Sequence, residues 1–144
     1  MDVGTLQPLI AKLLVTVQAI TGYPAAPKPP EVNFVPHAWF EEHACTGTGR
    51  CAVLAFLPPG HTIYLDDRLD PLQDLAAQSI LFHELVHYAQ AESGAFTMLP
   101  VCLAWHEKER EAYVAQLRFL QQQNAGLDVY ERLGAHAPLE PCPE

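Results

Sequence analysis

The chain has 144 residues, of which 49% are apolar, so it is long enough for one domain with its own core and too short for two. Eight basic against 17 acidic residues give a formal net charge of −9. An acidic chain without a cluster of Lys and Arg is a poor candidate for nucleic-acid binding, and it lacks a polybasic membrane patch. No stretch approaches the ~20 consecutive apolar residues of a membrane span, so we expect none.

The first third of the chain predicts a helix followed by extended segments. Apolar residues recur at helical spacing from Leu6 to Ile20 and predict an N-terminal packing helix over residues 1–22, ended near Gly22. A proline-rich connector follows, and Glu31 to Val35 is expected to be a strand.

The segment from His37 to His43 stays open between a helical turn and a loop. Both histidines are conceivable metal ligands, but a lone histidine outside a spacing pattern is usually structural or solvated.

A hairpin is predicted next, because two apolar runs flank the turn residues Pro58-Pro-Gly-His61. Its strands are Ala52 to Leu57 and Thr62 to Leu65, which completes a small sheet of about three strands within residues 31–66.

Two long helices and a proline-rich end fill the second half. Asp70 as N-cap and Pro71 as first helical residue predict a helix over residues 71–93, ended by Gly94. A nine-residue connection leads to a helix over residues 104–124, which we expect to fold back antiparallel to the first. A last short helix, Leu127 to Leu133, and an extended tail over residues 135–144 are expected after it.

Four cysteines favour an oxidising compartment. Cys45 and Cys51 flank a flexible Thr-Gly-Thr-Gly-Arg run and would close a small loop, which leaves Cys102 and Cys142 to pair and pin the tail. We therefore expect a periplasmic or secreted protein, although no secretory signal is visible. A cytoplasmic protein with four reduced cysteines is the alternative, since connectivity cannot be read from sequence.

The chemistry of the chain is concentrated at His83-Glu-Leu-Val-His87. Residues i and i+4 lie on one face of a helix, so His83 and His87 can present two nitrogens to one ion, for which zinc is favoured. Glu84 would accept the proton of a zinc-bound water. The alternative is two core histidines with a solvated Glu84.

A catalytic zinc site needs a third protein ligand, and the second long helix offers His106, Glu107, Glu109 and Glu111. Glu109 shares its face with Ala112, Tyr113, Gln116 and Leu120. Glu111 shares its face with Lys108, Ala115 and Arg118, which indicates solvent. Helical geometry favours Glu109 over Glu111 only modestly.

The combination of His83-Glu-Leu-Val-His87 with Glu109-Arg-Glu-Ala112, 22 positions later, resembles the minimal, single-domain gluzincin metallopeptidases, in particular the ImmA/IrrE-like branch and others with a Glu-x-x-Ala second motif. The resemblance implies an α+β, zincin-like minimal domain with Glu109 as third zinc ligand. It also implies that residues 52–57 form the sheet edge that pairs with extended substrate. Tyr113 departs from the Asp or Asn of several branches, so the carboxylate that often orients a ligand histidine is unassigned.

These features together predict a zinc metalloendopeptidase acting on a peptide or protein substrate. An electrophile for the developing oxyanion is needed, and the candidates are His106, Tyr113, Tyr130 and His136. The alternative is a catalytically weak or inactive zinc-binding regulatory or interaction domain, because 144 residues leave little for a substrate cleft. In a variant of it, the tail or Cys142 inhibits the site.

Overall fold

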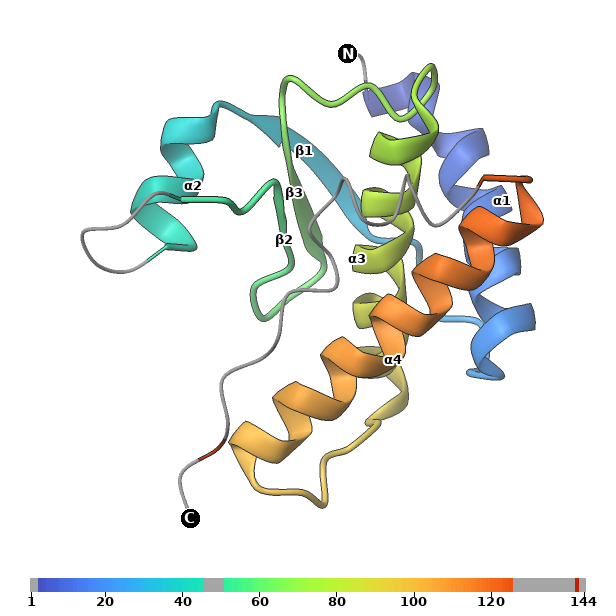
Figure 1. Cartoon of the computed structure of the whole chain (residues 1–144), viewed down its shortest axis with the longest axis vertical. Helices are drawn as coiled ribbons and strands as arrows, with labels where there is room; N and C mark the ends of the chain where they lie inside the picture. Colours follow the sequence, from blue (N-terminus) through green and yellow to red (C-terminus); the bar gives the residue numbers. More distant parts are fainter. Residues whose placement is uncertain (1–2, 46–50, 126–141, 143–144) are drawn as a thin grey trace.

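The computed structural model describes residues 3–45, 51–125 and 142. These residues form an α+β arrangement of four helices and one three-stranded mixed sheet (Figure 1). In chain order the elements are α1 (Val3–Thr21), β1 (Glu31–Val35), α2 (His37–His43), β2 (Ala55–Phe56), β3 (Thr62–Asp66), α3 (Leu75–Ser93) and α4 (Val101–Gln122). The predicted helix at 127–133 and all of the tail except Cys142 lie outside the described residues.

The sheet has the order β1-β3-β2, with β1 parallel and β2 antiparallel to β3. β2 is therefore an edge strand, as expected, but it is shorter than the predicted Ala52–Leu57. Its ladder consists of Ala55 opposite Leu65 and Phe56 opposite Tyr64. The turn to β3 contains Gly60 at φ +127, a conformation that side chains with a Cβ rarely adopt.

The segment left open by the sequence is a helix, α2. It buries Phe40 and lays Trp39 against the sheet, with the Trp39 ring stacked on Tyr64 at a centroid distance of 4.2 Å. This apolar anchoring explains why seven residues stay helical although isolated helices of that length are marginal in water.

The two long helices differ from prediction at their starts. α3 begins at Leu75 with Asp74 as N-cap, whose carboxylate accepts the Ala76 N–H at 3.2 Å. The predicted start at Asp70 and Pro71 was wrong, because Asp70 instead closes a separate turn by accepting the Leu72 N–H at 3.1 Å.

α4 begins at Val101, directly after Pro100 and three residues before the predicted start. Gly22 follows α1 at φ +80 and Gly94 ends α3 at φ +67, so both predicted C-terminal ends are confirmed.

The core lies around α3, which is packed between the sheet, α1 and α4 (Figure 1). α4 crosses back over α3 in the opposite direction, and the rings of Phe82 and Phe119 stack between them at 4.6 Å. Eleven residues of α3 are buried, His83 and Glu84 among them. A helix enclosed in this way is held firmly, so its side chains are well positioned for a site.

Both expected disulfides, Cys45–Cys51 and Cys102–Cys142, are formed. They indicate an oxidising environment. Within the described residues, no helix has both the length and the hydropathy that crossing a membrane demands.

Candidate metal centre

The three residues predicted as metal ligands converge on one point. His83 and His87 lie one turn apart on α3, and their Nε2 atoms are 3.1 Å from each other. Glu109 reaches them from α4: its Oε1 lies 3.4 Å from His83 Nε2 and contacts His87 Nε2. The exposed fraction of the His83 residue is 7%, so the cluster is largely removed from solvent.

The spacing of these donors suits a tetrahedral metal. Zinc binds His nitrogen and carboxylate oxygen at about 2.0–2.1 Å, so two ligand atoms of a tetrahedral site stand roughly 3.3 Å apart. The two distances from His83 Nε2, 3.1 and 3.4 Å, bracket that value. Two nitrogens and one oxygen form a donor set that fits zinc and leaves a fourth position open.

Gln116 of α4 orients the first histidine. Its Oε1 lies 2.9 Å from His83 Nδ1, while its Nε2 donates to the Ser79 hydroxyl at 3.2 Å. Ser79 donates in turn to the Ala76 carbonyl at 2.8 Å. Because the amide oxygen can only accept, the Nδ1 of His83 carries the proton. The lone pair of His83 is therefore on Nε2, the atom that faces Glu109.

Gln90 of α3 does the same for the second histidine. Its Oε1 lies 2.8 Å from His87 Nδ1, and its Nε2 donates to the Lys108 carbonyl at 2.9 Å and to Glu111 at 3.0 Å. The Nδ1 of His87 is thus also a donor, and its Nε2 faces the other two ligand atoms. Both imidazoles are held in the tautomer that a metal requires.

Glu111 belongs to this support rather than to the ligands. It is half-buried and accepts a hydrogen bond from the Tyr23 hydroxyl at 2.6 Å, as well as the one from Gln90. The expectation that the Glu111 face meets solvent was wrong, because the segment after α1 covers it with Tyr23. Burial, and then the bond to Glu111, raise the pKa of Tyr23 well above its usual range, so its hydroxyl stays a donor.

The charges of the three ligands are coupled. Burial opposes a charged His87, but the hydrogen bond to Glu109 and the nearby Glu84 and Glu109 carboxylates outweigh it and raise the pKa of His87 to about 9. Burial likewise opposes ionisation of Glu109, yet the contacts of its carboxylate with the His83 and His87 imidazoles hold its pKa well below its usual value. The centre therefore favours a positive charge between the three ligand atoms, which either a proton or a metal can supply.

Glu84 lies beside these ligands and opens into the same cleft. The exposed fraction of the residue is 7%, and it makes no hydrogen bond or ion pair with the other described residues. Each fully enclosed polar side-chain atom in the described part of the chain has a partner, so the free carboxylate of Glu84 faces the cleft. It is positioned to accept a proton there.

The cleft has a volume of about 760 Å³. One wall is the segment that contains β2, and the other is the face of α4 that carries Trp105, Glu109 and Tyr113. The volume falls within the range of about 300–1,000 Å³ typical of ligand sites. The length of the chain therefore does not prevent a substrate cleft, contrary to the expectation from sequence.

The four residues predicted as possible electrophiles differ in their position relative to the cleft. Tyr113 lines the cleft, and its ring lies against that of His83 at a centroid distance of 4.5 Å. His106 is not among the lining residues; its ring contacts that of Trp105, and its ligand nitrogen lies within 4.8 Å of the Cys102 and Cys142 sulfurs. Tyr130 and His136 lie outside the described residues. Glu107, another of the four ligand candidates, pairs instead with Arg110 at 3.3 Å.

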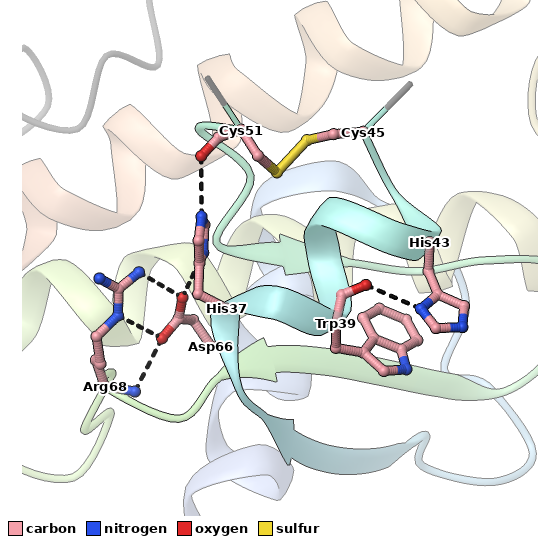
Figure 2. Close-up of a disulfide and its surroundings, with 7 residues drawn as sticks. All are labelled: His37, Trp39, His43, Cys45, Cys51, Asp66 and Arg68. Atoms are coloured by element: carbon pink, nitrogen blue, oxygen red, sulfur yellow. Dashed lines mark hydrogen bonds and ion pairs between the residues drawn. A yellow bond between two sulfur atoms is a disulfide. The ribbon is translucent and has the colours of Figure 1, made fainter. Parts of the chain in front are cut away.

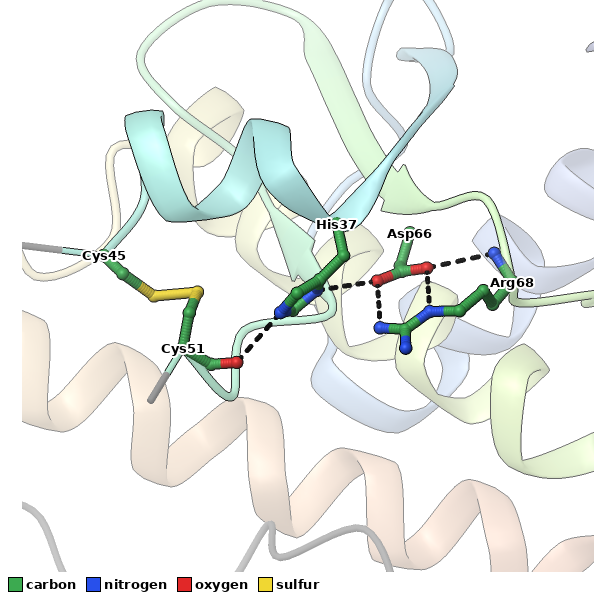
Figure 3. Close-up of polar contacts among 5 residues, drawn as sticks. All are labelled: His37, Cys45, Cys51, Asp66 and Arg68. Atoms are coloured by element: carbon green, nitrogen blue, oxygen red, sulfur yellow. Dashed lines mark hydrogen bonds and ion pairs between the residues drawn. A yellow bond between two sulfur atoms is a disulfide. The ribbon is translucent and has the colours of Figure 1, made fainter. Parts of the chain in front are cut away.

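His37 and His43 are engaged elsewhere, as expected for lone histidines. His37 Nδ1 lies 2.9 Å from Asp66 Oδ2, and its Nε2 lies 3.0 Å from the Cys51 carbonyl oxygen (Figure 3). Arg68 donates to both oxygens of Asp66, and these bonds lower the pKa of that carboxyl to about 2. His43 lies 2.9 Å from the Trp39 carbonyl oxygen (Figure 2).

The Cys45–Cys51 disulfide fastens the start of the cleft wall. It joins Cys45, two residues after α2, to the residue that precedes Ala52, and His37 Nε2 lies 3.0 Å from the Cys51 carbonyl oxygen (Figures 2 and 3). Two independent contacts therefore position the segment that leads into β2.

Sequence reasoning missed the residues that orient the ligands. Gln90 lies three residues after His87, and Gln116 lies seven after Glu109 on the same helical face. These spacings could have identified both residues. They were missed because a carboxylate was expected beside each histidine, although an amide oxygen can accept the imidazole N–H equally well.

Comparison of the chain with protein-family models, with curated proteins and with solved structures gives no match to any of them.

Proposed function

We propose that the chain is a zinc-dependent metallopeptidase of the gluzincin type, in which His83, His87 and Glu109 hold the metal and Glu84 is the general base. The observation that supports this most directly is the convergence of two imidazole Nε2 atoms, each with its Nδ1 bonded to an amide oxygen, on one carboxylate. Three acceptors directed at one point repel each other unless a cation lies between them.

Zinc bound there would polarise the scissile carbonyl and lower the pKa of a water in the open position toward ~7. Glu84 would take a proton from the attacking water and pass it to the leaving amine, which its free carboxylate at the cleft permits. Tyr113 is proposed to donate to the developing oxyanion, because it is the candidate that lines the cleft beside His83.

The substrate is proposed to be an extended peptide segment. β2 pairs with β3 on one side only, so its other edge can offer main-chain groups to a peptide in the cleft. The resemblance of the two motifs to those of gluzincins supports a substrate at this edge. With its two disulfides the enzyme would work in the periplasm or outside the cell.

The first test is zinc content per chain after dialysis, measured for the wild type and for single Glu-to-Gln variants at 84, 109 and 111. We expect about one zinc in the wild type and in Glu84→Gln, and loss in Glu109→Gln. Glu111→Gln tests the rival ligand on the same helix: Glu111 touches Gln90 but no ligand, so the zinc content should stay at about one per chain.

Turnover is then measured on a library of quenched fluorescent peptides. Glu84→Gln should abolish turnover while it keeps the metal. Folded wild type that takes up no zinc would disprove the metal site. Zinc-loaded wild type that cleaves no peptide would disprove the peptidase and leave a zinc-binding domain.

A further inference from the structure

A second group of metal donors lies at the N-terminal end of α4. Cys102 and His106 are four residues apart and so share one face of the helix. Cys142 is joined to Cys102, with their Cα atoms 5.8 Å apart. One ligand atom from each of the three residues lies within 4.8 Å of the others, and all three are partly exposed. This triad shares no donor with the centre formed by His83, His87 and Glu109.

No hydrogen bond ties the imidazole of His106 to the described part of the chain. Five other histidines have partners: four make the hydrogen bonds given above, and His61 pairs with Glu92 at 3.0 Å. His106 only contacts the edge of the Trp105 ring at a centroid distance of 5.3 Å, and it forms no hydrogen bond with the other described residues. Its nitrogens are therefore available to a ligand beside the two sulfurs.

The disulfide masks this donor set, because bonded sulfurs are poor metal ligands and only thiolates bind zinc well. A dithiol reductant would transfer two electrons and two protons to Cys102 and Cys142, and would itself become a disulfide. Zinc would then displace both thiol protons. Sulfurs of a tetrahedral zinc site stand roughly 3.8 Å apart. On reduction the two sulfurs would move apart to that spacing, and the His106 nitrogen already lies within 4.8 Å of both.

We propose that Cys102, His106 and Cys142 form a second, redox-gated zinc site, closed as a disulfide and opened by a dithiol reductant. Residue 142 thereby stays attached to α4 in both states, through a sulfur–sulfur bond or through the metal. The site is independent of the peptidase function, since it needs neither Glu84 nor a substrate.

Cobalt(II) is the probe, because thiolate ligation gives an intense near-ultraviolet charge-transfer band that a site of histidines and a carboxylate lacks. The full-length protein is titrated with cobalt under anaerobic conditions, first oxidised and then after reduction with a phosphine, which is removed. We expect one cobalt without the thiolate band in the oxidised protein. The reduced protein should bind a second cobalt with the band.

Three variants decide between the cysteine pairs. Cys102→Ser should abolish the band, whereas a protein with both Cys45→Ser and Cys51→Ser should keep it. His106→Leu retains both cysteines and the disulfide, so it guards against misfolding, and it should lower cobalt affinity of the reduced protein on the order of tenfold or more. A reduced wild type without the band overturns the proposal, as does a band that survives Cys102→Ser or an affinity unchanged in His106→Leu.

Discussion

Gln116 Oε1 lies 2.9 Å from His83 Nδ1 and thereby decides which nitrogen of that histidine faces the candidate metal centre. The amide cannot turn over without losing this contact and the bond from its Nε2 to Ser79. The tautomer of His83 is thus fixed from outside the ligand set.

Gln116→Leu should weaken zinc binding by roughly 10- to 100-fold, because the Nδ1 proton of His83 loses its acceptor. The affinity is measured by competition with a chromophoric chelator. Gln121→Leu is the control, since Gln121 is exposed on the same helix and should leave the affinity unchanged. Equal affinities for the two variants would show that Gln116 does not orient the ligand.

Zinc binding should release about one proton per chain at pH 7, because the pKa of His87 is raised to about 9 without metal and zinc needs the same lone pair. Zinc affinity should accordingly rise about tenfold per pH unit toward pH 9 and then level off. Calorimetry in two buffers of different protonation enthalpy gives the number of protons.

Glu84→Gln, which is expected to keep the metal, should reduce this release, since it removes a charge that raises the pKa of His87. Identical heats in both buffers for the wild type would contradict a protonated His87. For the metal-free fold, the same raised pKa contributes stability that is fully present below pH ~6.5 and is lost as the pH rises through about 9.

Tyr113→Phe should lower kcat on a cleaved peptide by roughly 100- to 1,000-fold with little change in KM, because a donor to the oxyanion acts in the transition state. Zinc content should stay at the wild-type value. His106→Gln provides the comparison, as His106 does not line the cleft and should retain full activity. If His106→Gln lost activity and Tyr113→Phe kept it, His106 and not Tyr113 would be the donor to the oxyanion.

Tyr23 and Glu111 should be energetically coupled, because the 2.6 Å bond between them is a hydrogen bond to a carboxylate. We expect Tyr23→Phe and Glu111→Gln each to lower the free energy of unfolding by about 1–3 kcal/mol, and the double variant to lower it by less than the sum. Urea unfolding of the zinc-loaded proteins measures this. Strict additivity would mean that the bond does not contribute.

The parts of the fold that depend on local chemistry could be predicted from sequence. Gly22 and Gly94 take a left-handed conformation that directly ends a helix, so both ends were correct. The start of α3 was misplaced because Asp70 and Asp74 are equally good caps locally, and it is Asp74 that caps the helix. The α+β class and both cysteine pairings were likewise predicted correctly from the sequence.

The candidate ligands and the residues that support them also differ in how far the sequence predicts them, because some depend on local spacing and others on tertiary packing. His83 and His87 are related by a helical turn, so their convergence follows from spacing alone. Glu109 needed the packing of α4 on α3, which periodicity suggested but did not decide. Glu111 was misjudged because Tyr23, which covers it, lies 88 positions away in the chain.

The shortness of β2 also bears on whether the protein stays dispersed. An exposed edge strand is a place where two copies of a chain can pair and aggregate. β2 contributes only two residues to its ladder, and Pro58 and Pro59 follow closely and have no N–H to donate. A second copy therefore meets an interrupted row of main-chain groups, whereas a single peptide anchored at a metal needs only a few of them. The same edge can thus be open to a substrate and resistant to self-association.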